Sequence, residues 1–319
     1  MTSPPDNSYP PLFRQIQPNP IPRTSEDEIS LHIPVIDLES LDDDALAAAC
    51  RDYGLIRLEN HGIPSDLSMK LQNETARLLS LSFEEKESRF HGSPVSYFWG
   101  TPAMRSLRSV NWVEGLHIPM DQLRSDVDSS FSSFRSLGAE YGEHMARIAR
   151  KKSFDAVARD LKLDSSQLGS YLDESHGILR VYRYPLCPDV GNYFGMDTHT
   201  DSSVWSILNQ DSVGGLQILH GNQWLHVPPV PGSIIVNVGD MLQAISNDKY
   251  KSVQHRVLAN GDKERMSLCY FAFPREGGVI KSSNYRPFTY QDFNAQVQQD
   301  VKDFGFKVGL ERFRIKSQG

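Results

Sequence analysis

The chain has 319 residues, with 40 Asp and Glu against 33 Lys and Arg, which gives a net charge of −7. This balance argues against a nucleic-acid-binding protein, whose contact face is basic, and no apolar run approaches the roughly 20 residues of a membrane span. The three cysteines lie far apart without zinc-like spacing, which indicates free thiols in a reducing compartment. We therefore expect a monomeric cytoplasmic protein that binds neither nucleic acid nor membranes.

The first part of the chain predicts an arm followed by short strands and helices. Residues 1–31 are rich in Pro, Ser and charge, which is typical of an arm lying on the body of a protein. Acidic residues, then alanines and then a glycine at 42–54 are typical of a short helix. The same reasoning predicts strands at 32–38 and 55–62, a helix at 64–81 and a capping box at 82–85.

The middle of the chain changes character twice. Residues 93–120 are dense in aromatics and follow no regular period, whereas apolar spacings of three and four predict a long helix at 132–152 that bends or continues toward Leu161. From 176 to 274 nearly every segment reads as a strand, namely at 177–186, 203–210, 215–221, 223–229, 232–240, 252–259 and 265–274. A last helix is predicted at 288–304.

Closely spaced short strands indicate a sandwich or barrel. We expect one domain over 1–319, mainly β with flanking helices. It divides into an N-terminal arm, a helix-rich region, a β core that carries the chemistry, and a C-terminal helix and tail, at 1–31, 32–175, 176–275 and 276–319.

The sequence "HTD" at 199–201 raises the possibility of a metal site. Residues two apart on a strand point to the same face, so His199 and Asp201 can reach one point in space. A third ligand is needed, and His61, His226 and His255 all compete for that role, with His255 on a later strand of the same β region. Two histidines and a carboxylate leave coordination positions open and suit non-haem Fe(II). The alternative is a surface histidine hydrogen-bonded to a neighbouring aspartate.

Arg265 and Ser267, in "ERMS", also lie two residues apart on a predicted strand. A guanidinium holds a carboxylate by two bonds and a nearby hydroxyl adds a third, which is an arrangement suited to 2-oxoglutarate beside an iron site. Taken alone, Arg265 is better explained by a surface ion pair with Glu264 or with the neighbourhood of Asp262.

Longer segments resemble a known family. "HTD…NQDSVGGLQIL", "WLHVPPVPGSIIVNVGDMLQAISNDKYKSVQHRVLAN" and "ERMSLCYFAFP" resemble the plant dioxygenases that depend on Fe(II) and 2-oxoglutarate. "SYFWGTP…VNWVEGLHIP", "RYPLCP" and "VQQDVKDFGFKVGLERF" are most similar to gibberellin 2-oxidases of the C20 class and their relatives in specialised metabolism. The resemblance implies a double-stranded β-helix, or jelly-roll, core with an N-terminal wrap of helices and strands.

The resemblance also implies the cofactors and the residues that hold them. Fe(II) is expected on His199, Asp201 and His255, and the distal carboxylate of the cosubstrate 2-oxoglutarate on Arg265 and Ser267. Tyr184 falls where the family has a tyrosine that helps to hold the cosubstrate, although a simple core aromatic is an equal alternative. O2 is the other cosubstrate, and ascorbate is expected to support activity.

Departures from the family pattern concern the substrate pocket. Tyr182 stands where relatives have Asn, and Phe98 stands where the nearest class has Arg, so we expect a pocket with one fewer cation and more aromatic surface. Its predicted walls, each of which could instead be ordinary core, are Phe98, Trp99, Tyr182, Val204, Trp205, Phe271 and Phe273.

The predicted function is hydroxylation or desaturation of a small hydrophobic plant metabolite, a diterpenoid. It is either gibberellin-like or a more neutral polycyclic compound, such as a tanshinone-type abietane whose dihydrofuran becomes a furan. The alternatives are a gibberellin 2-beta-hydroxylase proper, an iron oxidase of the same fold that does not use 2-oxoglutarate, and a metal-free jelly-roll binding protein.

Overall fold

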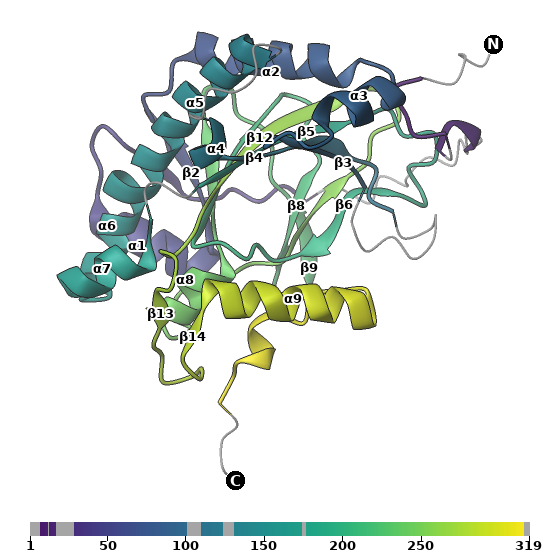
Figure 1. The fold of residues 1–319 in the computed structure, drawn as a ribbon. Helices are drawn as coiled ribbons and strands as arrows, with labels where there is room; N and C mark the ends of the chain where they lie inside the picture. Colours follow the sequence, from purple (N-terminus) through teal and green to yellow (C-terminus); the bar gives the residue numbers. More distant parts are fainter. Residues whose placement is uncertain are drawn as a thin grey trace.

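Two β-sheets, one large and one small, form the centre of the protein (Figure 1). The computed structural model describes residues 7–11, 13–16, 29–100, 110–123, 131–173 and 177–315. The rest of the predicted arm, the predicted boundary at 176 and the last four residues lie outside this part. In it, the large sheet has the strand order β1-β2-β10-β7-β12-β5-β4-β3 and the small sheet β6-β11-β8-β9.

The strands follow from apolar, β-branched and aromatic runs. Ile234–Val238, for example, is buried throughout, because helices cover one face of the large sheet and the small sheet covers the other. The large sheet comprises β1 Val35–Asp37, β2 Leu55–Glu59, β10 Ile234–Val238, β7 Trp205–Gln210, β12 Arg265–Ala272, β5 Ile178–Tyr184, β4 Glu114–Pro119 and β3 Ser96–Trp99. The small sheet comprises β6 Phe194–His199, β11 His255–Leu258, β8 Leu216–His220 and β9 Gln223–His226, and β13 Val279–Ile280 pairs separately with β14 Phe288–Thr289.

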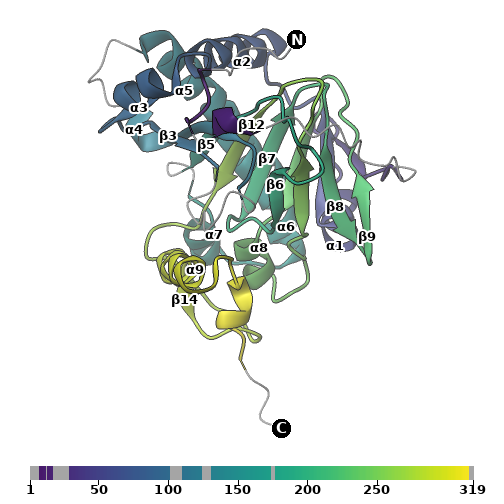
Figure 2. The same cartoon turned by 90° about the vertical axis from the view of Figure 1, so that its right-hand side faces the viewer.

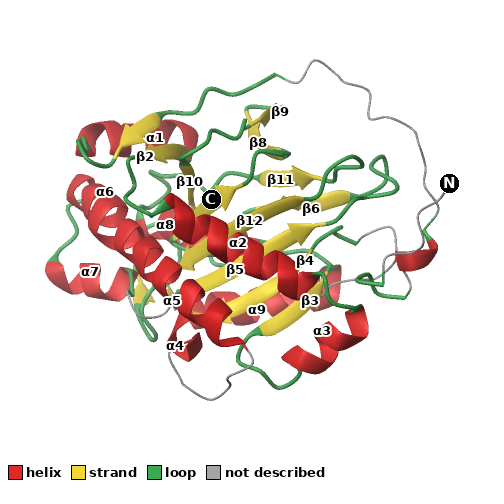
Figure 3. Cartoon of the chain, turned by 90° about the horizontal axis from the view of Figure 1, so that it is seen from above, coloured by secondary structure: helices red, strands yellow, loops and turns green. Residues whose placement is uncertain are grey.

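Helices cover the outer face of the large sheet, where α2 and α5 lie across it (Figure 3). Their ends follow the sequence signals: Asp42 caps α1 by accepting a hydrogen bond from the Ala45 amide, and Gly54 ends it with φ 63°. Ser82 and Glu85 form the predicted capping box. The helices are α1 Asp43–Tyr53, α2 Ser65–Leu79, α3 Phe83–Phe90, α4 Met120–Leu123, α5 Ser132–Arg147, α6 Asp155–Asp160, α7 Ser165–Tyr171, α8 Asp240–Ile245 and α9 Tyr290–Phe304, with short 3-10 turns at Phe13–Gln15 and Gly309–Arg312.

The structure adds several elements that the pattern did not predict. The aromatic segment 93–120 contributes β3 and β4 to the edge of the large sheet, and α7 and α8 fall in segments without a clear helical period. The long helix does continue beyond 152, but through a π-helical stretch, Ile148–Phe154, before α6. No helix in the described part of the chain is long and apolar enough to cross a membrane.

The core has two main layers, which follow from the arrangement of helices, large sheet and small sheet shown in Figure 2. One lies between the helices and the large sheet, and the other lies between the two sheets. Since successive side chains of a strand alternate between faces, each residue of the large sheet belongs to one layer or the other. The mainly β fold with flanking helices is confirmed.

Candidate functional site

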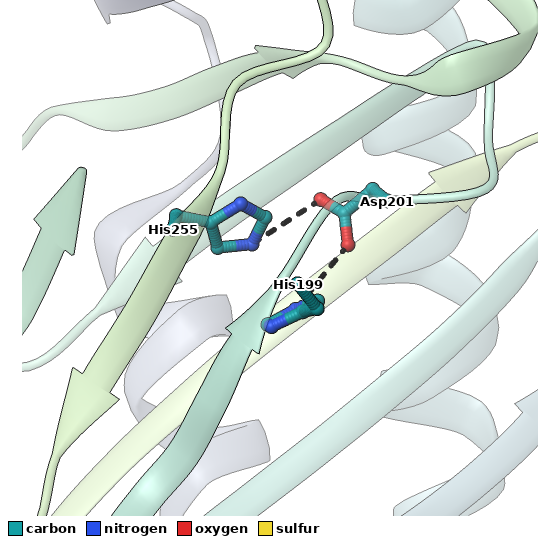
Figure 4. A group of neighbouring side chains, drawn as sticks. All are labelled: His199, Asp201 and His255. Carbon is teal, nitrogen blue, oxygen red and sulfur yellow. Dashed lines mark ion pairs between the residues drawn. The ribbon is translucent and has the colours of Figure 1, made fainter. Parts of the chain in front are cut away.

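Three side chains from separate positions in the chain meet at one end of the small sheet, where β6 ends and β11 begins. His199 ends β6, Asp201 lies just beyond it, and His255 begins β11 directly opposite His199. Figure 4 shows the three side chains pointing toward one another, with Nε2 of His199 at 3.7 Å and Nε2 of His255 at 3.6 Å from the Asp201 carboxylate. One ligand atom from each residue lies within 4.8 Å of the others, so the three can hold one metal ion.

Neighbouring carbonyl groups set the orientation of both imidazoles. Nδ1 of His199 lies 2.7 Å from the carbonyl oxygen of Asp197, and Nδ1 of His255 lies 3.2 Å from that of Val253. Because a carbonyl oxygen only accepts, each Nδ1 carries the proton and each Nε2 keeps a free lone pair directed at Asp201. This is the usual way in which a protein fixes the tautomer of a metal-binding histidine.

The protonation states also suit metal binding. Burial, reinforced by the adjacent His255, lowers the pKa of His199 to about 3. Burial alone would raise the pKa of Asp201, but the two histidines and Ser206 together hold it below its ordinary value. At neutral pH the site therefore offers a neutral imidazole and a carboxylate, which are the forms that bind Fe(II).

Arg265 lies on the interior face of the large sheet with unused hydrogen-bonding capacity. Its side chain is 1% exposed, and it donates to Ser267 Oγ at 3.2 Å and to Gln210 Oε1 at 3.0 Å. The guanidinium stacks on the ring of Tyr184, 4.6 Å away. Arg265 Nε and Gln210 Nε2 are buried without a partner, and no carboxylate in the described part of the chain pairs with this arginine. A buried cation with free donors fits a carboxylate ligand such as that of 2-oxoglutarate.

The thiol of Cys269 interacts electrostatically with both Arg265 and Asp201. It lies on the same face of β12, and burial and then the Asp201 carboxylate raise the pKa of its thiol, while Arg180 and Arg265 act in the opposite direction. The thiol is thus within electrostatic reach of both groups. Cys269 and Tyr184 pack in the layer between the two sheets, and Arg265, which shares the Cys269 face of β12, therefore faces this layer too.

The predicted pocket residues divide between three places. Phe98, Tyr182 and Phe271 lie in the interior layer, and the rings of Phe98 and Tyr182 meet edge to face at 5.9 Å. Trp99 belongs instead to an aromatic cluster with Trp112 and Phe13.

The other three pocket residues lie elsewhere. Val204 and Trp205 are fully buried in the layer on the helix side, and Phe273 packs on Tyr290 at 4.6 Å. Trp205 faces away from the interior because its neighbour Ser206 takes the inward position of β7, opposite Phe271.

Sequence reasoning missed a cation inside the site. Arg180 shares the interior face of β5 with Tyr182 and Tyr184, since the three residues are spaced by two. Its Nε donates to Nδ1 of His117 at 3.0 Å, and its guanidinium lies 5.3 Å from the ring of Phe271. The alternation in "RVYRY" was the signal that could have found it. The strand face that carries Tyr182 and Tyr184 therefore also carries a cation, although Phe98 is not one.

Comparison with known proteins decides the family. The model of the 2OG-Fe(II) oxygenase superfamily matches residues 175–274, and that of the non-haem dioxygenase in morphine synthesis N-terminal region matches residues 33–133. Gibberellin 2-beta-dioxygenase 8 of Arabidopsis thaliana is 38% identical over 301 residues, covering 89% of this chain and 87% of the relative. The chain belongs to the 2OG-Fe(II) oxygenase superfamily. Gibberellin 2-beta-dioxygenase 6 of Oryza sativa subsp. japonica is 36% identical, covering 88% of this oxygenase and 84% of the relative.

Solved structures agree with the fold. The crystal structure of JOX2 in complex with 2OG, Fe and JA aligns with a TM-score of 0.75 at 26% identity and covers 91% of both chains. The rice dioxygenase for auxin oxidation aligns at 0.72 and 24% identity, covering 89% of this oxygenase and all of that chain. The jelly-roll prediction is confirmed, as are the oxidoreductase class and the use of Fe(II) and 2-oxoglutarate.

Bound Fe(II), with 2-oxoglutarate and O2, supplies the oxidising chemistry of this superfamily. The residues of this oxygenase contribute orientation and exclusion of water. The two carbonyl-anchored imidazoles and Asp201 present their ligand atoms toward one point, Arg265 offers unused donors, and the aromatic interior keeps the space between them dry.

Proposed function

We propose that this oxygenase oxidises a C–H bond of a small polycyclic diterpenoid whose oxygen acceptor faces Arg180. We assign Fe(II) to His199, Asp201 and His255, and the distal carboxylate of 2-oxoglutarate to Arg265 with Ser267 and Tyr184. The observation that carries the substrate class is Arg180, a cation on the interior face that pairs with no carboxylate in the described part of the chain.

The surroundings of Arg180 favour a ligand with one polar end and an apolar body. Burial and then Arg180 itself lower the pKa of His117 to about 4, so at neutral pH this imidazole is uncharged and accepts the hydrogen bond from Arg180 without balancing its charge. Nη1 of Arg180 also donates to the Tyr182 hydroxyl at 3.4 Å, so neither of these partners is a carboxylate, and an oxygen of the substrate would supply a further acceptor. The rings of Phe98, Tyr182 and Phe271 offer flat apolar surfaces beside it.

The relatives support a diterpenoid, because those with 32–38% identity include several gibberellin 2-beta-dioxygenases. Gibberellins are carboxylic acids, and such an acid would neutralise Arg180. A second candidate is a flatter, neutral polycyclic compound such as a tanshinone-type abietane, whose dihydrofuran would be desaturated to a furan. The aromatic side chain of Phe98 favours it, and its carbonyl oxygen would also accept a hydrogen bond from Arg180.

The test is incubation of the purified protein with Fe(II), 2-oxoglutarate and a diterpenoid panel. The panel pairs each gibberellin acid with its methyl ester and adds neutral abietane quinones. Mass changes of +16 and −2 report hydroxylation and desaturation, and one succinate per product checks that 2-oxoglutarate is the cosubstrate. Selective oxidation of free acids supports the first candidate, and oxidation of quinones supports the second. Turnover of no diterpenoid, by protein that still converts 2-oxoglutarate to succinate, would overturn the substrate class.

Arg180→Met tests the role of the cation. Loss of one charge-assisted hydrogen bond, about 1.5–3 kcal/mol, should raise KM for the accepted substrate about 10- to 100-fold. Arg286→Met, which changes an exposed arginine beside Phe313, serves as the matched control and should leave KM unchanged. An unchanged KM in folded Arg180→Met protein would show that Arg180 does not contact the substrate.

A further inference from the structure

The loop that carries Asp201 is held from one side by the N-terminus of α8. The amide of Asp240 donates to the carbonyl of Asp201 at 2.8 Å, and the amide of Gly239 donates to that of Val204 at 3.0 Å. A Cβ atom at Gly239 would lie 2.0 Å from the Ser203 carbonyl oxygen, so a glycine is required for this approach. These backbone contacts hold residues 201–204, and a side chain ties the start of the loop to α8, since Thr200 Oγ1 donates to Asp240 Oδ2 at 3.3 Å.

Lys307 holds the start of the loop from the C-terminal segment. It follows α9, and its ammonium donates to the carbonyl of Thr200 at 2.5 Å and to Ser202 Oγ at 3.3 Å. Thr200 is the residue between His199 and Asp201. One lysine side chain, 16% exposed, therefore contacts the backbone that joins two of the metal ligands.

The same ammonium neutralises a buried acid. Nζ of Lys307 lies 2.8 Å from Asp240 Oδ2, whose side chain is 5% exposed. No other ion pair to Asp240 occurs in the part of the chain that the structure describes. Without Lys307, this carboxylate would be buried and uncompensated at the start of α8, next to the amide that holds the Asp201 carbonyl, and its charge would favour movement of this contact.

We propose that Lys307 is a positioning residue for the metal centre. It fixes residues 200–202 and the Asp240 carboxylate, and thereby holds Asp201 against the two imidazoles. The direction in which metal affinity changes when Lys307 is removed distinguishes a positioning role from a pure charge effect. A lysine that acted through charge alone would repel a divalent cation, so its removal would tighten metal binding, whereas loss of a positioning group weakens it.

The test uses Co(II) as the probe on the metal-free full-length protein without 2-oxoglutarate. Loss of an outer-shell partner typically weakens metal binding about 10- to 100-fold, so Lys307→Met should raise the Co(II) dissociation constant about tenfold or more. Lys307→Arg should restore much of the affinity. Lys281→Met, at an exposed lysine beyond β13, is the matched control and should bind Co(II) like the wild type. Circular dichroism establishes that each variant is folded.

A kinetic readout separates positioning from damage to the reaction. With Fe(II) varied and succinate formation followed, Lys307→Met should raise KM for Fe(II) and recover much of kcat at saturating Fe(II). Wild-type or tighter Co(II) binding by folded Lys307→Met overturns the proposal. If that variant does not fold, Lys307→Gln replaces it, because the shorter, neutral side chain removes the charge that compensates Asp240 and withdraws the donor from Thr200. A weaker Co(II) affinity of Lys307→Gln supports the proposal and an unchanged affinity overturns it.

Discussion

Arg265→Met removes the buried guanidinium of β12 and keeps an apolar stem in its place. Under the proposed function, the guanidinium of Arg265 forms two charge-assisted hydrogen bonds to the distal carboxylate of 2-oxoglutarate. At about 1.5–3 kcal/mol each, their loss amounts to about 3–6 kcal/mol, or about 100- to 10,000-fold in the dissociation constant. Arg265→Lys keeps the charge but not the planar fork, so we expect roughly half of that free-energy loss.

The assay is an anaerobic titration of the Fe(II)-loaded protein with 2-oxoglutarate, followed by calorimetry. Metal affinity provides an internal control, since Arg265 is not among the ligands and Co(II) should bind both variants like the wild type. Arg89→Met, at an exposed arginine of α3, is the matched control. A less than threefold change in the 2-oxoglutarate dissociation constant of folded Arg265→Met would refute the assignment.

Two further predictions concern buried charge. Burial lowers the pKa of His117 to about 4. The unfolded chain therefore takes up a proton at this residue near pH 6.5, whereas the folded protein does so only near pH 4. Through this group, the free energy of unfolding should fall by on the order of 1–2 kcal/mol between pH 7 and pH 5. Urea unfolding at both pH values should show a smaller fall in His117→Gln, and an equal fall would contradict the assignment. The ammonium of Lys86 contacts Glu114 at 2.5 Å, and both side chains are fully buried. Lys86→Met should therefore lower the free energy of unfolding by about 3 kcal/mol. Adding Glu114→Gln should recover part of that loss, and no recovery would show that the charge of Glu114 is not its cause.

Much of the fold could be predicted because local signals and tertiary packing agree. Asp42 and Gly54 mark the ends of α1, and the Ser82–Glu85 capping box starts α3. The strands of the second half were recognisable from β-branched and aromatic runs between turns. The π-helical stretch was not, because nothing in the apolar spacing of 148–154 distinguishes it from an ordinary helix.

Residue type was enough to predict the two histidines and the aspartate of the candidate metal site. The face of a strand to which a side chain points was harder to predict. His199 and His255 do face each other across β6 and β11, although Asp201 reaches them from the loop rather than from the strand. The aromatic surface of Trp205 predicts a pocket wall, but the strand turns this side chain toward the helices. Differences from the family pattern do not point to Arg180, whereas the alternation of side chains along β5 places it on the same face as Tyr182 and Tyr184.

The two sheets share no strand pairing in the described part of the chain, and the chemistry is distributed between them. Both histidines belong to the small sheet, while Arg265 and Tyr184 belong to the large one. No backbone ladder joins the two histidines to Arg265, so apolar side chains such as Ile218 and Val257, which pack between the sheets, set the spacing between them. Substitution of such an apolar side chain can therefore change the spacing between the histidines and Arg265 while leaving these residues themselves unaltered.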